Sequence, residues 1–230
     1  MISLLGIAGL LVIAWAMSTN RSAINPRSVL GAFAIQVVIG GFVLYFPPGK
    51  AMLNALADGV THVLAYSKAG IDFLFGSLNN QAWSGIGFVF AINVLPVIIF
   101  FASLIAVLYH IGIMGWVIRI IGGALQLTLK TSRPESMSAA ANIFVGQTEA
   151  PLVVKPFIRQ MTRSELFAVM VGGLASIAGS VMAGYALMGV DLEFLLAACF
   201  MAAPGGLMMA KMLVPETSDP KNELQELDDE

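Results

Sequence analysis

Apolar residues along this chain gather into five long runs separated by more polar connections. A helix needs about 20 apolar residues to cross the hydrocarbon core of a bilayer, so such runs predict membrane-spanning helices. The predicted spans are Ile2–Met17, Val29–Phe46, Ile86–Tyr109, Leu166–Met188 and Phe194–Leu213. The pattern therefore predicts an all-α polytopic membrane protein with about five transmembrane helices, the last kinked near Pro204.

Two connections carry an amphipathic pattern. In Ala51–Leu64 the apolar residues fall near one helical face, and Gly112–Leu129 repeats this arrangement with Trp116 and Arg119 suited to an interface. Helices of this kind lie along the membrane surface more readily than they cross it. We therefore expect two interfacial amphipathic helices.

The segment Glu135–Met161 is apolar at both ends and polar at its centre. Basic residues flank it on both sides, which favours a re-entrant hairpin over a single crossing. Its arms, Ser136–Val145 and Pro151–Gln160, would each reach about 15 Å as helix, roughly half the hydrocarbon core. Gly146 permits the turn, and the tip is predicted to lie near the bilayer midplane.

The second arm of this hairpin is expected to begin with free backbone amides at Gln147–Glu149. Pro151 suits the first turn of a helix because its missing N–H would have no partner there. Transporters with discontinuous helices bind substrates and ions at such termini. Glu149 is the one carboxylate in the hairpin interior, and an ionisable group at that depth points to function.

The fourth predicted span is rich in small residues, and two interpretations stay open. Ala175, Gly179 and Ala183 recur at a spacing of four, which is typical of close helix packing. Alternatively, Gly172-Gly173 and Ser176 mark a locally unwound stretch whose carbonyls could bind a cation, since hard cations take oxygen ligands.

Composition agrees with a membrane protein. Hydrophobic residues make up 58% of the chain and charged residues 11%, and the net charge of −2 supplies no basic field for nucleic acid. With the N-terminus in the periplasm, ten of the twelve Lys and Arg residues face the cytoplasm. We expect a bacterial inner-membrane protein with a cytoplasmic C-terminal tail. The sequence contains no paired catalytic set, so we do not expect an enzyme.

The predicted organisation has six segments along the chain. They are the first two spans (1–47), a periplasmic-side interfacial helix and loop (48–85), the third span with the cytoplasmic-side amphipathic helix (86–133), the hairpin (134–163), spans four and five as a transport core (164–213) and an acidic tail (214–230).

The motif GQTEAP, within SAAANIF…PF…MTRSE, carries a resemblance. With GIMGWVIRIIGG upstream, ASIAGSVMAGY downstream and the closing MLVPET, the stretch Ile86–Glu216 resembles the concentrative nucleoside transporter family. The resemblance implies a homotrimer of cation-coupled nucleoside symporters that work by an elevator motion.

The same resemblance implies site residues. Gln147, Thr148 and Glu149 would contact the nucleobase, with Val181 beneath it. Sodium, the implied coupling ion, would be held by Asn142, Val145, Ser176 and Ile177. The Gly146-Gln147 pair sits where members tune purine against pyrimidine preference, and we expect pyrimidine nucleosides.

Family members have a second, related half that holds the ribose, and this chain stops before it. We therefore expect the chain to supply the base-facing and sodium-facing sides of the site and not to transport alone. Two alternatives stay open: proton coupling with Glu149 as the carrier, and a truncated, non-transporting membrane fragment or scaffold.

Overall fold

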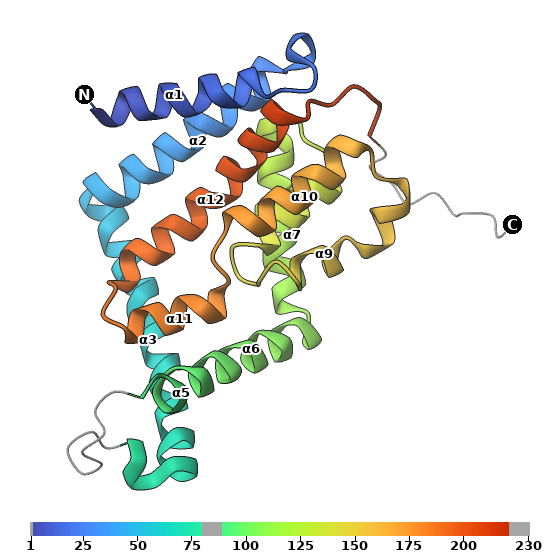
Figure 1. Ribbon diagram of the computed structural model, residues 1–230. Helices are drawn as coiled ribbons and strands as arrows, with labels where there is room; N and C mark the ends of the chain where they lie inside the picture. The colour runs from blue at the N-terminus through green and yellow to red at the C-terminus, as the bar shows by residue number, and fades with distance from the viewer. Residues whose placement is uncertain (1, 80–88, 221–230) are drawn as a thin grey trace, which may run out of the picture.

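The computed structural model describes residues 2–79 and 89–220, and every regular element within them is helical (Figure 1). The all-α prediction is thereby confirmed. The α-helices are α1 (Ile2–Ala16), α2 (Pro26–Tyr45), α3 (Pro47–Phe75), α5 (Phe90–Asn93), α6 (Leu95–His110), α7 (Ile113–Leu129), α8 (Arg133–Ala141), α9 (Ala150–Val153), α10 (Arg163–Ala175), α11 (Gly179–Leu187) and α12 (Leu192–Leu213). Three 3-10 turns accompany them: η1 (Arg21–Ala23), η2 (Gly76–Asn79) and η3 (Lys155–Gln160).

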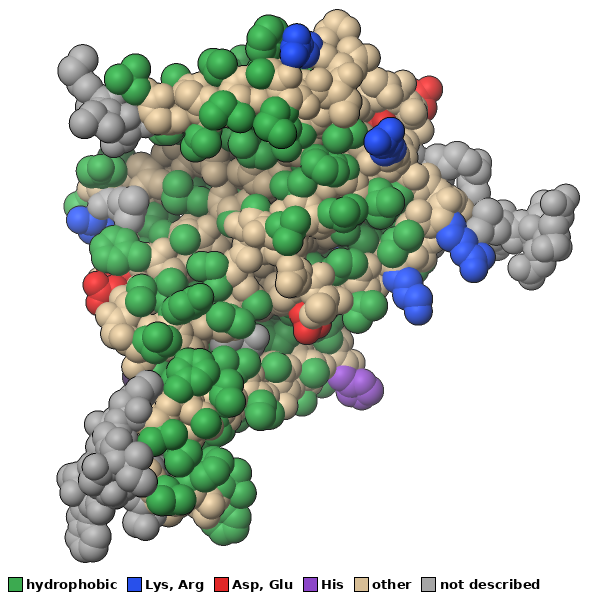
Figure 2. Space-filling model, in the orientation of Figure 1, with side chains coloured by type: hydrophobic (Ala, Val, Ile, Leu, Met, Phe, Trp, Pro, Cys, Tyr) green, Lys and Arg blue, Asp and Glu red, His purple; other side chains and the backbone are tan. Residues whose placement is uncertain are grey.

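Three stretches of helix are long and apolar enough to cross a membrane within the described part of the chain. They are Pro26–Val43, Phe90–His110 and Leu192–Leu213. Large hydrophobic side chains remain exposed on these and neighbouring helices, such as Leu10, Val37 and Ile99. Figure 2 shows hydrophobic side chains spread over the visible face of the molecule, with Lys and Arg mostly toward its rim. Such a surface suits contact with lipid.

The third predicted span is divided in two. Its first residues, 86–88, lie outside the described part of the chain, and the remainder forms α5 and α6 with a break at Val94. Pro96 lies in the first turn of α6, where the helix has no hydrogen bond that would need the N–H that proline lacks. Asn93 stabilises the end of α5 by donating from Nδ2 to Val89 O (3.0 Å).

The interfacial helix predicted at Ala51–Leu64 is much longer than expected. It forms the middle of α3, a continuous helix of 29 residues. It begins at Pro47, four residues before the predicted start, because Pro47 and Pro48 end α2 and open α3 across an extended Phe46 (φ −91°, ψ 132°). Polar residues do not interrupt it. Thr61 Oγ1, for example, donates to Ala57 O (2.8 Å), so the hydroxyl is satisfied by the helix itself.

Helix α12 is the centre of the packing. Figure 1 shows it between α2 and α10, and small core residues such as Ala32 and Ala210 let these helices approach closely. It runs unbroken through Pro204. Gln36 Nε2, on α2, donates to Met201 O (3.0 Å) in the turn that precedes this proline. The core therefore gathers around α12.

Candidate functional site

The hairpin predicted at 134–163 begins with a well-capped helix and ends irregularly. Helix α8 opens with a capping box in which Ser132 N donates to Glu135 Oε1 (2.7 Å). It ends at Ala141, four residues earlier than predicted. The second arm, expected as ten residues of helix, is the four-residue α9 followed by η3. Pro156 explains the change, because it has no N–H with which to continue the α-helical ladder.

The turn between the arms spans residues 142–149, and its backbone is partly self-satisfied. The amides of Glu149 and Ala150 both donate to Gly146 O (3.2 and 3.0 Å). The expectation of a free amide at Glu149 is therefore wrong. The Glu149 carboxylate folds back over Gly146, where an added Cβ would lie 2.7 Å from Oε2. A side chain at this position would displace the Glu149 carboxylate.

The fourth predicted span is two helices, not one. Helix α10 ends at Ala175 and α11 begins at Gly179, and between them Ser176 (φ −109°, ψ 155°) and Ala178 (φ −61°, ψ 136°) are extended. The interpretation of local unwinding is therefore confirmed, centred on Ser176–Ala178. Gly172 and Gly173 stay helical, so the prediction that they mark the unwound stretch is wrong.

The hairpin turn packs directly on this break, and glycines make the contact possible. A Cβ on Gly172 would lie 3.0 Å from Asn142 Nδ2, and one on Gly173 would lie 2.9 Å from Gln147 Cβ. A Cβ on Gly179 would overlap the carbonyl of Phe144. Close packing and unwinding thus occur together, and Asn142 packs on Gly172, one helical turn before the break.

Asn142 is the most informative residue at this contact. Its side chain is 1% exposed, and Nδ2 donates to Ser138 O (3.0 Å), yet Oδ1 is buried without a hydrogen-bond partner. A buried acceptor left unpaired is unfavourable by about 1–3 kcal/mol. Amide and main-chain carbonyl oxygens are ligands for hard cations, so the orphaned oxygen fits a cation.

The other predicted site residues divide between the buried contact and the surface. Val145 is buried, and Ser176 and Ile177 are half-buried at the break. Cys199 Sγ lies 3.8 Å from Ile177 O. Gln147, Thr148 and Glu149 are exposed at the tip, and Val181 is 38% exposed on the first turn of α11. The residues predicted to hold sodium are thus buried or half-buried, and those predicted to contact the base are exposed.

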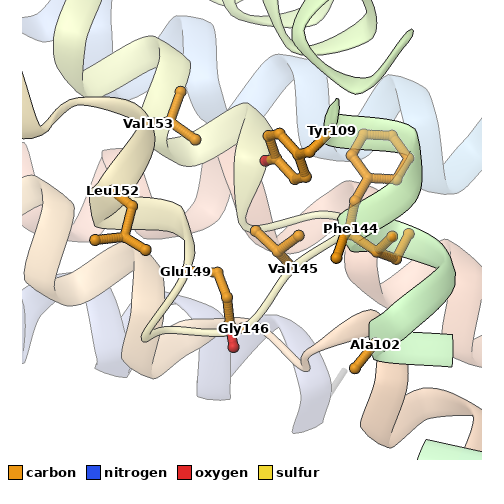
Figure 3. A pocket seen from close by; sticks show the side chains of 10 residues that line it. Ala102, Tyr109, Phe144, Val145, Gly146, Glu149, Leu152 and Val153 are labelled. Atoms are coloured by element: carbon orange, nitrogen blue, oxygen red, sulfur yellow. The ribbon is translucent and has the colours of Figure 1, made fainter. Parts of the chain in front are cut away.

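A cavity of about 400 Å³ lies between α6 and the hairpin (Figure 3). Its wall is apolar, with Ala102, Ile105 and Leu152 among its residues, and Tyr109 and Glu149 supply its two polar side chains. They enter from different walls, Tyr109 from α6 and Glu149 from the turn. Apolar clefts of 300–1,000 Å³ with a few polar groups are typical small-molecule sites. Tyr109 was not singled out in the sequence, because nothing near it in the chain marks it.

The base of the hairpin holds a buried ion pair that the sequence did not reveal. Lys211 Nζ, near the end of α12, lies 2.7 Å from Glu135 Oε2 and donates to Ser164 Oγ (3.0 Å). Glu135 is 2% exposed and Lys211 7%. A charge pair buried this deeply needs close geometry and further hydrogen bonds to be stable.

Comparison with known proteins decides the family. One family model, described as Na+ dependent nucleoside transporter N-terminus, matches residues 5–78, and a second, described as nucleoside recognition, matches residues 91–191. The nucleoside permease NupC of Helicobacter pylori is 57% identical over 217 residues, which are 93% of this chain and 52% of that protein. The chain belongs to the concentrative nucleoside transporter family. The resemblance seen in its motifs is thus confirmed.

A further relative and a solved structure support the same family assignment. The sodium/nucleoside cotransporter 1 of Mus musculus is 41% identical over 96% of this chain and 33% of its own length. The structure of CNTnw in an inward-facing substrate-bound state matches with a TM-score of 0.93 and 60% identity, over 97% of this chain and 55% of that one. The chain therefore spans about half the length of NupC and of CNTnw, and it is a multi-pass membrane protein of a transporter family.

Proposed function

We propose that this chain forms the base-facing and sodium-facing half of a sodium-coupled nucleoside symporter. The observation that carries the proposal is Asn142 Oδ1, a buried amide oxygen without a hydrogen-bond partner, on a hairpin turn that packs against the helix broken at Ser176–Ala178. A broken helix inside a membrane bundle offers main-chain carbonyls that a helix would otherwise use. The sodium/nucleoside cotransporter names of the mammalian relatives support sodium as the coupling ion.

The sodium ion would be held by oxygens of Asn142, Val145, Ser176 and Ile177. In this assignment the Asn142 side chain supplies Oδ1, and the turn and the break supply the other oxygens. Sodium is a hard cation and takes such ligands. Among the described residues no group of three His, Cys, Asp or Glu side chains could hold a metal ion, which also favours a site built from neutral oxygens.

The nucleoside base would be contacted by Gln147, Thr148 and Glu149, with Val181 beneath it. The exposed tip leaves these side chains free to meet a ligand. A glutamine amide offers both a donor and an acceptor, so it can pair with the edge of a base. We propose a preference for pyrimidine nucleosides, with the ribose held by a second half of the protein.

The remaining features of the assembly are proposed on the family resemblance and the charge pattern. The N-terminus would face the periplasm of a bacterial inner membrane, and the hairpin would enter from the cytoplasm. Three copies would form a homotrimer, and the substrate site would move between the two membrane faces.

A chimera tests the proposal. This chain replaces the matching segment of the H. pylori nucleoside permease NupC, which is 57% identical and supplies the other half. We expect sodium-dependent uptake of uridine by cells that express the chimera. Asn142→Ala should abolish the sodium dependence, because it removes the orphaned oxygen.

Asn93→Ala is the matched control, since Asn93 makes the same bond to a carbonyl four residues earlier but lies on α5. Sodium-independent uptake by the unmodified chimera, or an equal effect of both substitutions on uptake, would contradict the sodium assignment.

Uptake that depends on pH and not on sodium would favour proton coupling through Glu149. This second candidate is based on the exposure of the Glu149 carboxylate to the cavity. A chimera that inserts and neither binds nor transports uridine would favour a membrane scaffold.

A further inference from the structure

Helices α8 and α10 begin with the same local motif. Ser132-Arg133-Pro134-Glu135 opens α8, and Thr162-Arg163-Ser164-Glu165 opens α10. In both, the glutamate accepts a hydrogen bond from the backbone amide of the N-cap residue at 2.7 Å. This reciprocal cap fixes where a helix begins. The first residue of each helix is therefore fixed by the same kind of cap.

The two helices also reach the candidate sodium site after equal lengths. Asn142 follows Glu135 by seven residues, and Gly172 follows Glu165 by seven residues. Seven residues are about two helical turns, or roughly 10 Å. At that point Asn142 packs against Gly172, where an added Cβ would lie 3.0 Å from Nδ2. The caps at one end thus set the register of the contact at the other.

Lys211 joins the two caps. Its Nζ pairs with Glu135 Oε2 at the start of α8 and donates to Ser164 Oγ at the start of α10. It also lies 3.4 Å from Glu216 Oε2, and this oxygen accepts from Thr162 Oγ1 (2.8 Å), the N-cap of α10. Ser164 Oγ in turn donates to Val214 O (2.7 Å), directly after α12. One ammonium group therefore links the starts of both helices to the end of α12.

We propose that Lys211 is a positioning residue, which sets the register of α8 against α10 and thereby the geometry of the sodium site between Asn142 and the break. This inference rests on the proposed function for its sodium readout. The residue never touches the ion, and its effect passes through two rigid helical turns. Residues that orient ligands from outside a metal site affect affinity without contacting the metal.

The test distinguishes a positioning role of Lys211 from a contribution to the stability of the fold alone. Lys211→Met alone leaves the Glu135 carboxylate buried without a counter-ion, so this variant tests only the stability of the fold. The informative variant is Lys211→Met with Glu135→Gln, because the glutamine keeps the capping bond to Ser132 while the uncompensated charge is removed. In the 230-residue chain we expect the melting temperature to recover in this double variant. We also expect the amides of residues 142–149 to lose protection in hydrogen–deuterium exchange.

In the NupC chimera the double variant should need about tenfold more sodium for half-maximal uridine uptake, the size of effect typical of residues that orient metal ligands. Lys68→Met, an exposed lysine on α3, is the control and should change neither readout. A double variant with recovered melting temperature, unchanged exchange and unchanged sodium requirement would overturn the proposal, because Lys211 would then be purely structural.

Two further arms keep the outcomes distinct. If the double variant does not fold, Lys211→Arg replaces it, since the charge is kept while the longer, planar guanidinium shifts the register. We expect that variant to fold with an intermediate sodium requirement, and wild-type behaviour in both readouts would count against the proposal. If the unmodified chimera shows no sodium dependence but exchange still rises in the double variant, the proposed function fails and the positioning role stands.

Discussion

The two ends of the α8–α10 pair differ in the surroundings of their charged groups, which are buried and paired at the base and exposed at the tip. At the base, Glu135, Lys211 and Ser164 are buried and joined by an ion pair and hydrogen bonds. At the tip, Gln147 and Glu149 are exposed, and close to them Asn142 Oδ1 is buried but unpaired. The ion-paired network makes the base rigid. Buried oxygens without a hydrogen-bond partner occur at both ends, namely Ser132 Oγ and Glu165 Oε1 at the base and Asn142 Oδ1 near the tip. The ion pair gives the base a structural role, and the proposed ligand contacts lie at the tip.

The largest effect should come from breaking the base. Lys211→Met leaves the Glu135 carboxylate buried without its counter-ion, and such changes lower the free energy of unfolding by about 3–5 kcal/mol. Thermal unfolding in detergent measures this loss. A melting temperature equal to that of the unmodified chain would show that the pair contributes nothing to stability.

An intermediate effect should follow from separating the tip from the break. In Gly179→Val the new side chain would overlap the Phe144 carbonyl, and overpacking of this kind lowers stability by about 1–3 kcal/mol. Gly123→Ala on α7 is the control, because a Cβ there meets nothing within 4 Å. Thermal unfolding of the two variants gives the difference, and equal stability would mean that the turn does not depend on this contact.

The smallest effect on stability should come from the tip itself. Glu149→Gln changes an exposed side chain, so we expect no shift in melting temperature. Uridine affinity in the NupC chimera should fall by about 1.5–3 kcal/mol if the carboxylate accepts hydrogen bonds from the base. A titration of uridine binding at saturating sodium measures this, and unchanged affinity would remove Glu149 from the proposed site.

Much of the fold could be predicted from local patterns. The prolines at 47 and 48 stop one helix and start the next whatever surrounds them, and the polar centre of the hairpin predicts a turn near Gly146. The extent of α3 could not be predicted in this way. Its polar residues interrupt the apolar pattern, but they satisfy their own groups within the helix and so do not end it.

The residues of the candidate site could be predicted only where the sequence carries a recognisable motif. Asn142 packs against Gly172, one helical turn before Ser176, and the sequence left open whether the fourth span unwinds. The packing of Gly172 and Gly179 against the turn decides that question, and it depends on residues about 30 positions away in the chain. The partnership of Lys211 with Glu135 was hidden for the same reason. It joins positions 76 residues apart. From the sequence alone, a lysine near the end of an apolar helix is interpreted as an ordinary membrane-flanking charge.

Cys199 gives the helix break a built-in reporter. It is the one cysteine in the sequence, it is buried, and its sulfur faces the carbonyl of Ile177. A small thiol reagent can modify it only when the surrounding helices separate, so the rate of labelling would follow that opening without any engineered probe. Binding of an ion at the proposed neighbouring site would then slow the alkylation of a single native atom.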